Sequence, residues 1–65
     1  MSKQRGDFWA VQFSTGGYGN RHATQKAAVQ DAESSNRYSE RAQGERIARA
    51  VVQYRAWEPV REVAV

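Results

Sequence analysis

The 65-residue chain contains no cysteine, one histidine and one proline. The absence of cysteine excludes disulfides and thiolate metal ligands, and the lone His22 offers only one imidazole, so we expect no bound metal and no cofactor. No apolar run approaches the roughly 18 residues that span a bilayer, and no apolar segment follows the basic start of the chain as it does in a signal peptide. We therefore expect a cytoplasmic protein with no membrane partner.

Residue patterns typical of catalysis are also missing. A nucleophilic triad needs a base beside its Ser or Cys, and His22 lies next to a glycine-rich turn. The acidic residues stand among Arg and Lys, where pairing on a helix surface explains them. The segment 16–19 (G-G-Y-G) has neither the Gly-Lys-Ser/Thr of a phosphate loop nor the spacing of a dinucleotide motif, so it predicts a hairpin turn. We expect a protein that is not an enzyme.

The small size limits the fold to a single domain, 1–65, in which residues 1–6 are expected to form a flexible N-terminus. Such a short chain buries only about 60% of the surface that its unfolded form exposes. Without disulfides or a metal, self-association is the remaining way to add stability, and we expect a homodimer.

The first two thirds of the chain predict a hairpin followed by a helix. Residues 8–13 (F-W-A-V-Q-F) are short and rich in aromatic and β-branched side chains, as in a strand, with Trp9, Val11 and Phe13 on the core face. A short returning strand is expected at 20–23. Thr24 is a suitable N-cap for the helix that follows, and Gly44 is a plausible end for it. Small residues repeat at helical spacing along this segment, which would let the helix lie close to a sheet.

The segment 49–57 (R-A-V-V-Q-Y-R-A-W) fits both a strand and a helix. The adjacent valines and the aromatic residues favour a strand, and 60–65 would form a further extended segment. We therefore predict an α+β fold, a small antiparallel sheet with one helix on one face in the order β-β-α-β, with a further C-terminal strand. The alternative is a hairpin followed by two helices.

The charge of the chain is mildly basic, +3 in total. Segments 1–22 and 46–65 each carry +2, and 23–45 carries −1. An anionic partner would therefore meet the two end segments first. The alternative is that mixed surface charge only maintains solubility.

A strand at 49–57 would also divide its side chains between two faces. We expect Ala50, Val52, Tyr54 and Ala56 to face the core, and the intervening residues to share the open face with Phe8 and Gln12. Aromatic and Arg side chains together suit contact with a base, a phosphate or a protein carboxylate. The predicted binding residues, which include Tyr54 as support and Tyr18 and Arg21 on the neighbouring loop, are Trp57, Arg55, Arg49, Tyr54, Gln53, Tyr18, Arg21 and Phe8.

Two classes of partner remain open. Tyr, Trp and Arg dominate the energetics of protein interfaces, whereas aromatic and basic side chains on an open sheet are typical of single-stranded RNA readers. Because the net charge is low, we favour a partner protein, a component of a nucleic-acid-handling machine, and keep direct DNA or RNA binding as the alternative. A third interpretation is that Trp57 and Phe8 complete a second small core, under the C-terminal segment or across a dimer interface.

In size and in its Ala-, Arg- and Gln-rich composition the chain resembles the small accessory proteins of bacteriophages and mobile elements, anti-CRISPR proteins among them. The resemblance concerns general style and assigns no residue a role. It implies an inhibitor that acts by stoichiometric occupancy of a partner's working surface.

Overall fold

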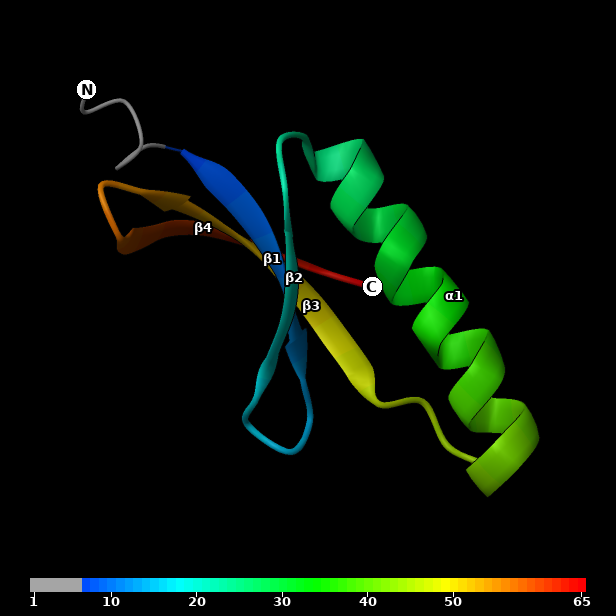
Figure 1. Cartoon of the computed structure of the whole chain (residues 1–65). Helices are drawn as coiled ribbons and strands as arrows, with labels where there is room; N and C mark the ends of the chain where they lie inside the picture. Colours follow the sequence, from blue (N-terminus) through cyan, green and yellow to red (C-terminus); the bar gives the residue numbers. More distant parts are fainter. Residues whose placement is uncertain (1–6) are drawn as a thin grey trace.

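The computed structural model describes residues 7–65, so the predicted flexible segment 1–6 lies outside the described residues. One antiparallel sheet has the strand order β2-β1-β3-β4, and a single helix packs on it (Figure 1). The predicted α+β fold and its further C-terminal strand are confirmed, and the alternative with two helices is wrong. Within residues 7–65, no helix is long and apolar enough to cross a membrane. The elements are β1 (Phe8–Phe13), β2 (Tyr18–His22), α1 (Gln25–Gln43), β3 (Ala48–Arg55) and β4 (Glu58–Ala64).

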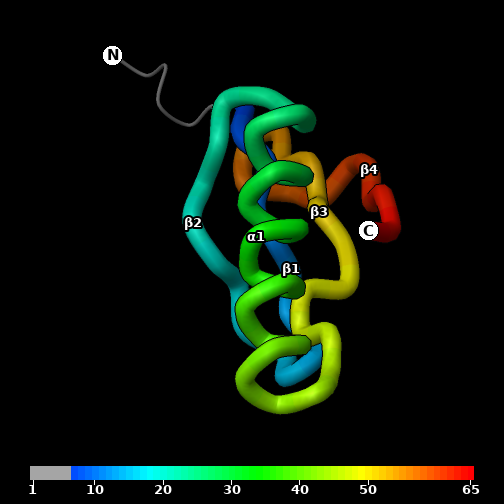
Figure 2. Tube along the Cα trace, turned by 90° about the vertical axis from the view of Figure 1, so that its right-hand side faces the viewer, coloured from blue at the N-terminus to red at the C-terminus, as the bar shows by residue number. Residues whose placement is uncertain are grey.

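The helix α1 begins and ends at the predicted caps. Thr24 has extended backbone geometry, and its Oγ1 accepts a hydrogen bond from the Ala27 N–H at 3.1 Å. Gly44 adopts the left-handed conformation (φ 79°) and donates its N–H to the Glu40 carbonyl at 2.9 Å. Between the caps the helix lies across the sheet, over β1 and between the edge strand β2 and the central strand β3 (Figure 2).

The core between α1 and the sheet is made of small side chains. Val11 from β1 and Val51 from β3 face each other in register and are fully buried against Ala28 and Ala32 of the helix. Trp9 is the one aromatic side chain buried in this layer. The core face predicted for β1 is thus confirmed. Alanine at the helix positions permits a close approach of α1, because no longer side chain separates it from the sheet.

A buried asparagine connects the helix to the start of β3. Asn36 is 2% exposed, its Nδ2 donates to the Ala48 carbonyl at 3.0 Å, and its Oδ1 accepts the Ala48 N–H at 2.8 Å. The side-chain amide therefore satisfies both backbone groups of Ala48, as a neighbouring strand would do. Ser39, also buried, donates its hydroxyl to the Asn36 carbonyl at 3.2 Å.

The register of β3 corrects the predicted assignment of its two faces. Phe8 lies opposite Tyr54 and Ala10 opposite Val52, so these side chains share the sheet face that α1 does not cover. Val51, predicted to lie on the open face, is instead in the core under the helix. Ala50 and Val52 are buried as predicted, but they lie on the face opposite α1, and the helix covers the face that carries Val51. Ala56 is no core residue either, because it is exposed in the turn after β3.

Candidate functional site

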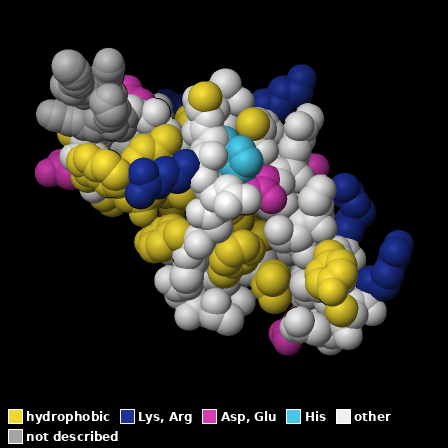
Figure 3. All heavy atoms as spheres, viewed as in Figure 1, with side chains coloured by type: hydrophobic (Ala, Val, Ile, Leu, Met, Phe, Trp, Pro, Cys, Tyr) yellow, Lys and Arg dark blue, Asp and Glu magenta, His cyan; other side chains and the backbone are white. Residues whose placement is uncertain are grey.

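Aromatic side chains gather on the sheet face opposite α1. Pairing of Phe8 with Tyr54 places one ring on each central strand, and Tyr18 and Arg21 of β2 face the same way because they lie opposite Gln12 and Ala10. Trp57 joins them from the turn between β3 and β4. We call this group the aromatic face; it consists of Phe8, Tyr18, Arg21, Tyr54 and Trp57. In the space-filling view, hydrophobic side chains cluster at this end of the sheet with a basic side chain lying over them (Figure 3).

The rings of the aromatic face pack against one another. Phe8 and Tyr54 are stacked, with ring centroids 5.1 Å apart and an interplanar angle of 12°. Tyr18 meets Tyr54 edge to face at 6.2 Å and 80°, and Trp57 meets Phe8 at 5.5 Å and 64°. Such geometries are the favoured ones for aromatic pairs, each worth about 0.5–1.5 kcal/mol beyond burial. The rings are therefore held in defined positions although Tyr18 and Trp57 are each 54% exposed.

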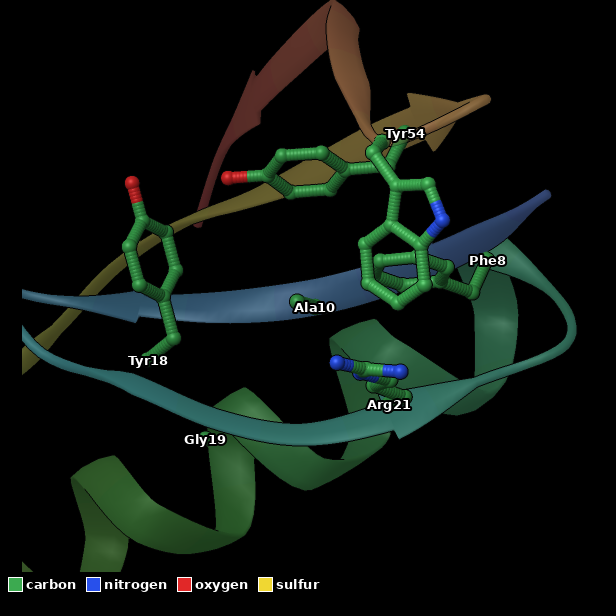
Figure 4. Close-up of a pocket in the computed structure, with 7 residues that line it drawn as sticks. Phe8, Ala10, Tyr18, Gly19, Arg21 and Tyr54 are labelled. Carbon is green, nitrogen blue, oxygen red and sulfur yellow. The ribbon is translucent and has the colours of Figure 1, made fainter. Parts of the chain in front are cut away.

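Arg21 lies against two of these rings. Its guanidinium carbon is 4.7 Å from the Phe8 ring centroid and 4.6 Å from that of Trp57. Both distances are within the range of cation–π attraction. These contacts fix the guanidinium above the sheet and leave its N–H groups at the pocket (Figure 4).

The turn that presents Trp57 has an unusual backbone. Ala56 and Trp57 both have positive φ, 53° and 70°, as the two central residues of a hairpin turn with left-handed geometry. Asn and Gly are the residues that adopt this geometry readily, whereas an L residue with a Cβ pays about 1–2 kcal/mol. The chain thus keeps an indole at a position where glycine would be favoured, and the aromatic face is what the indole contacts.

A pocket of about 260 Å³ opens between these side chains. Its walls are the rings and Arg21, and Ala10 and Gly19 contribute to its lining without bulky side chains. In the close-up the Tyr18 and Tyr54 hydroxyls point toward each other on one side, and Arg21 lies on the other (Figure 4). The polar groups of the lining side chains are one guanidinium, two hydroxyls and the indole N–H of Trp57, which is the composition of a binding pocket with few orienting groups.

Hydrogen bonding with Tyr18 raises the pKa of Tyr54 to about 12, and partial burial of its hydroxyl adds to the effect. Tyr54 therefore stays neutral at physiological pH. It can donate or accept a hydrogen bond at the mouth of the pocket but cannot act there as a base.

Five of the eight predicted binding residues come together in the aromatic face, and three do not. Gln53 and Arg55 alternate with Tyr54 and so point to the other side of the sheet. Arg55 is exposed there and its Nε lies 3.8 Å from Asp7 Oδ2. Arg49 is the extra residue of a bulge in β3, since Ala48 and Ala50 pair with consecutive residues of β1. The prediction that Gln53 and Arg55 share an open face with Phe8 and Trp57 is wrong, whereas Arg49 is exposed but does not line the pocket between the rings.

Tyr18 and Arg21 belong to β2 and not to a loop, because the turn after β1 ends before Tyr18. It closes with the Gly16 N–H donated to the Phe13 carbonyl and the Phe13 N–H to that of Gly17. Gly16, at φ 99°, supplies the conformation that the turn requires.

Sequence reasoning did not assign a role in binding to Ala10 or Gly19. A Cβ on Gly19 would come within 3.2 Å of the Phe13 ring, so glycine lets β2 lie close to that ring. Ala10 alternates with Trp9 and Val11, so the period of two in 8–13 also indicates a small side chain on the open face beside Phe8. Gln12 lies on the same face as predicted, and its buried Oε1 has no hydrogen-bond partner among residues 7–65.

The single histidine lies on the other side of the sheet. His22 Nε2 is 2.8 Å from Asp31 Oδ2, which connects the end of β2 to α1, and the histidine is visible beside an acidic side chain in Figure 3. Residues 7–65 contain no group of three or more His, Asp or Glu side chains able to hold a metal ion.

Comparison of the chain with protein-family models, with curated proteins and with solved structures gave no match. The case for a function therefore depends on the geometry and chemistry of the aromatic face.

Proposed function

We propose that this protein is a non-enzymatic binding protein that occupies a partner protein stoichiometrically through its aromatic face. The observation that carries the proposal is Trp57, which is half exposed on a left-handed turn and held by Phe8 and Arg21. Left-handed geometry at non-glycine residues is costly and is concentrated at sites of ligand contact. An exposed Trp beside Tyr and Arg is also the side-chain set that dominates interface energetics.

The charges around the aromatic face favour a protein over a nucleic acid. Among the described residues that line the pocket, Arg21 is the one cation, and Glu62 lies on the same side of the sheet because it pairs with Val52. A strand of nucleic acid bound at the pocket would meet this guanidinium and a nearby carboxylate, whereas tight binding of a phosphate backbone needs several cations. The placement of Phe8 and Tyr54 on the two central strands supports direct nucleic-acid binding as the second candidate, because open-sheet RNA readers stack bases on rings so placed. In either case, a nucleic-acid-handling machine remains the proposed setting.

The test is a selection that assumes no particular partner. The intact chain is immobilised and used to select from a random peptide library and, in parallel, from a random single-stranded DNA pool. We expect enrichment of peptides, with binding lost in the Trp57→Gly variant, which removes the indole and suits the left-handed turn. Tyr38→Ala is the matched control, since Tyr38 is 73% exposed on the helix, away from the pocket.

Three results would count against the proposal in different ways. Enrichment of DNA alone, with affinity falling steeply as salt rises, would establish the nucleic-acid alternative. Peptides that bind Trp57→Gly as well as the natural chain would place the site elsewhere. Enrichment of neither pool would reject a binding role for the aromatic face.

Self-association remains a prediction, and the aromatic face is the surface on which it would compete with a partner. Sedimentation at high micromolar concentration distinguishes the states, because a 7.4 kDa species is a monomer with its aromatic face open.

A further inference from the structure

The pocket of the aromatic face combines a place for one ring with a fixed cation that forms no ion pair among residues 7–65. We propose that it recognises an aromatic side chain flanked by a carboxylate, in an acidic, aromatic peptide segment of the partner. The inference rests on the proposed function and names the chemistry of the partner segment that the pocket would take.

The size of the pocket suits a single aromatic side chain. A buried apolar cavity of about 150 Å³ accommodates benzene, and the pocket here measures about 260 Å³. Tyr18 and Tyr54 stand nearly perpendicular to each other, so an inserted ring can stack on one while meeting the edge of the other. Ala10, on the same sheet face, adds only a methyl group to the lining beside these rings.

The charge of the pocket calls for an anion. Arg21 takes part in none of the ion pairs that the charged side chains of residues 7–65 form. Phe8 and Trp57 hold the plane of the guanidinium through its carbon atom, so the N–H groups at its edge remain available as a fork. A carboxylate accepts two parallel hydrogen bonds from such a fork.

The same contacts argue against a cationic ligand. Aromatic cages bind alkylammonium groups over their ring faces, but two of the four rings here already hold the guanidinium of Arg21. A second cation would be repelled at this distance.

A peptide is favoured over a nucleotide by the polar groups of the lining. Besides Arg21, the described residues of the lining offer the hydroxyls of Tyr18 and Tyr54 and the indole N–H of Trp57, and none of them has an amide side chain to read the edge of a base. A single cation satisfies one carboxylate, and Glu62 on the same face disfavours a second phosphate nearby. The observations therefore favour an aromatic residue next to Asp or Glu.

The test uses three capped tripeptides titrated into the intact, isotope-labelled chain and followed by NMR at the Trp57 indole N–H and the Arg21 Nε–H. The probes are acetyl-Glu-Phe-Glu-amide, acetyl-Gln-Phe-Gln-amide, which lacks the charge, and acetyl-Glu-Ala-Glu-amide, which lacks the ring. We expect the first to bind with a Kd of about 1 mM, as befits a small fragment, and about ten-fold more tightly than either other probe.

Variants of Arg21 test whether this residue is responsible for the preference for the acidic probe. Arg21→Gln should abolish the preference for the Glu probe over the Gln probe while retaining the preference for Phe over Ala. Arg21→Lys keeps the charge but loses the paired N–H groups, so it should retain part of the preference for Glu over Gln. Arg55→Gln is the matched control, because it removes an exposed arginine on the other side of the sheet. If Arg21→Gln does not fold, as judged from its amide spectrum, the Arg21→Lys variant decides the point.

Equal affinity for the Glu and Gln probes, or an unchanged preference in the Arg21 variant that folds, would overturn the inference. So would a thymidine oligonucleotide that binds more tightly than acetyl-Glu-Phe-Glu-amide. If the peptide selection still yields binders that depend on Trp57, the proposed function stands and only the acidic, aromatic specificity falls. If the selection yields none, both fall.

Discussion

The two faces of the sheet are built from different kinds of side chain. Under the helix, the largest fully buried side chains are Val11, Val51, Asn36 and Ser39. On the other face, four of the chain's seven aromatic residues remain partly or largely exposed. In most proteins the large rings fill the core and small residues are free to lie outside it. Here the helix-covered layer provides close packing and hydrogen bonds and contains Trp9 with Phe13 beside it, whereas the four rings of the aromatic face are left available for contact with another molecule.

The largest effect expected from a single change is at Asn36, in the helix-covered layer. Asn36→Leu removes both hydrogen bonds to Ala48 and leaves a buried N–H and C=O without partners, which should lower the free energy of unfolding by about 3 kcal/mol. Chemical denaturation measures it. Asn36→Asp, which keeps only the acceptor, should also be strongly destabilising, whereas Ser34→Ala on the exposed side of α1 should change stability by less than about 0.5 kcal/mol. If Asn36→Leu left the free energy of unfolding unchanged, the hydrogen bonds of Asn36 would not contribute to the stability of the helix-covered layer.

A smaller effect of opposite sign is expected at the tip of the aromatic face. Ala56→Gly relieves a left-handed conformation (φ 53°) and should raise the free energy of unfolding by about 0.5–1 kcal/mol. The matched control is Ala42→Gly in α1, where the loss of helix propensity should cost a similar amount. Thermal melts of the two variants should therefore shift in opposite directions. A lower melting temperature for Ala56→Gly would contradict the strained turn.

The smallest effect concerns alkaline pH. Because the pKa of Tyr54 is raised from 10.0 to about 12, the folded state holds this proton more tightly than the unfolded state. The resulting stabilisation is complete below about pH 10 and is lost as the pH rises toward about 12. Solvent screening keeps it small. Denaturation midpoints measured across this range should fall less steeply for Tyr54→Phe than for the natural chain or for Tyr38→Phe, and identical slopes would contradict the assigned role of the Tyr18 contact.

Much of the fold could be predicted from local chemistry. Thr24 and Gly44 mark the ends of α1 because capping depends on a few adjacent residues, and the alternation in 8–13 identifies its core face because Trp9, Val11 and Phe13 are bulkier than their neighbours. The weak point was β3, where Ala50, Val51 and Val52 are all buried. Its two faces are both apolar, so a period of two shows that side chains alternate but not which set lies under the helix.

The candidate site was only partly predictable for the same reason. Its composition of Trp, Tyr, Phe and Arg was evident, but which of them meet depends on the pairing of Phe8 with Tyr54 and on the bulge at Arg49. Those are long-range features set by the whole sheet. The turn at Ala56 and Trp57 lacked the Asn-Gly signal of its type, so its geometry could not be anticipated from propensity.

The side-chain amide of Asn36 also restricts which loop of the chain can change in length. It fixes the position of Ala48 against α1, so shortening the connection 44–47 would pull Ala48 away from its two hydrogen bonds. The glycine-rich turn after β1 has no such restraint at its tip, because a Cβ on Gly16 or Gly17 would meet no atom within 4 Å. Insertions, tags or grafted segments should therefore be tolerated between β1 and β2, whereas deletions between α1 and β3 should destabilise the fold.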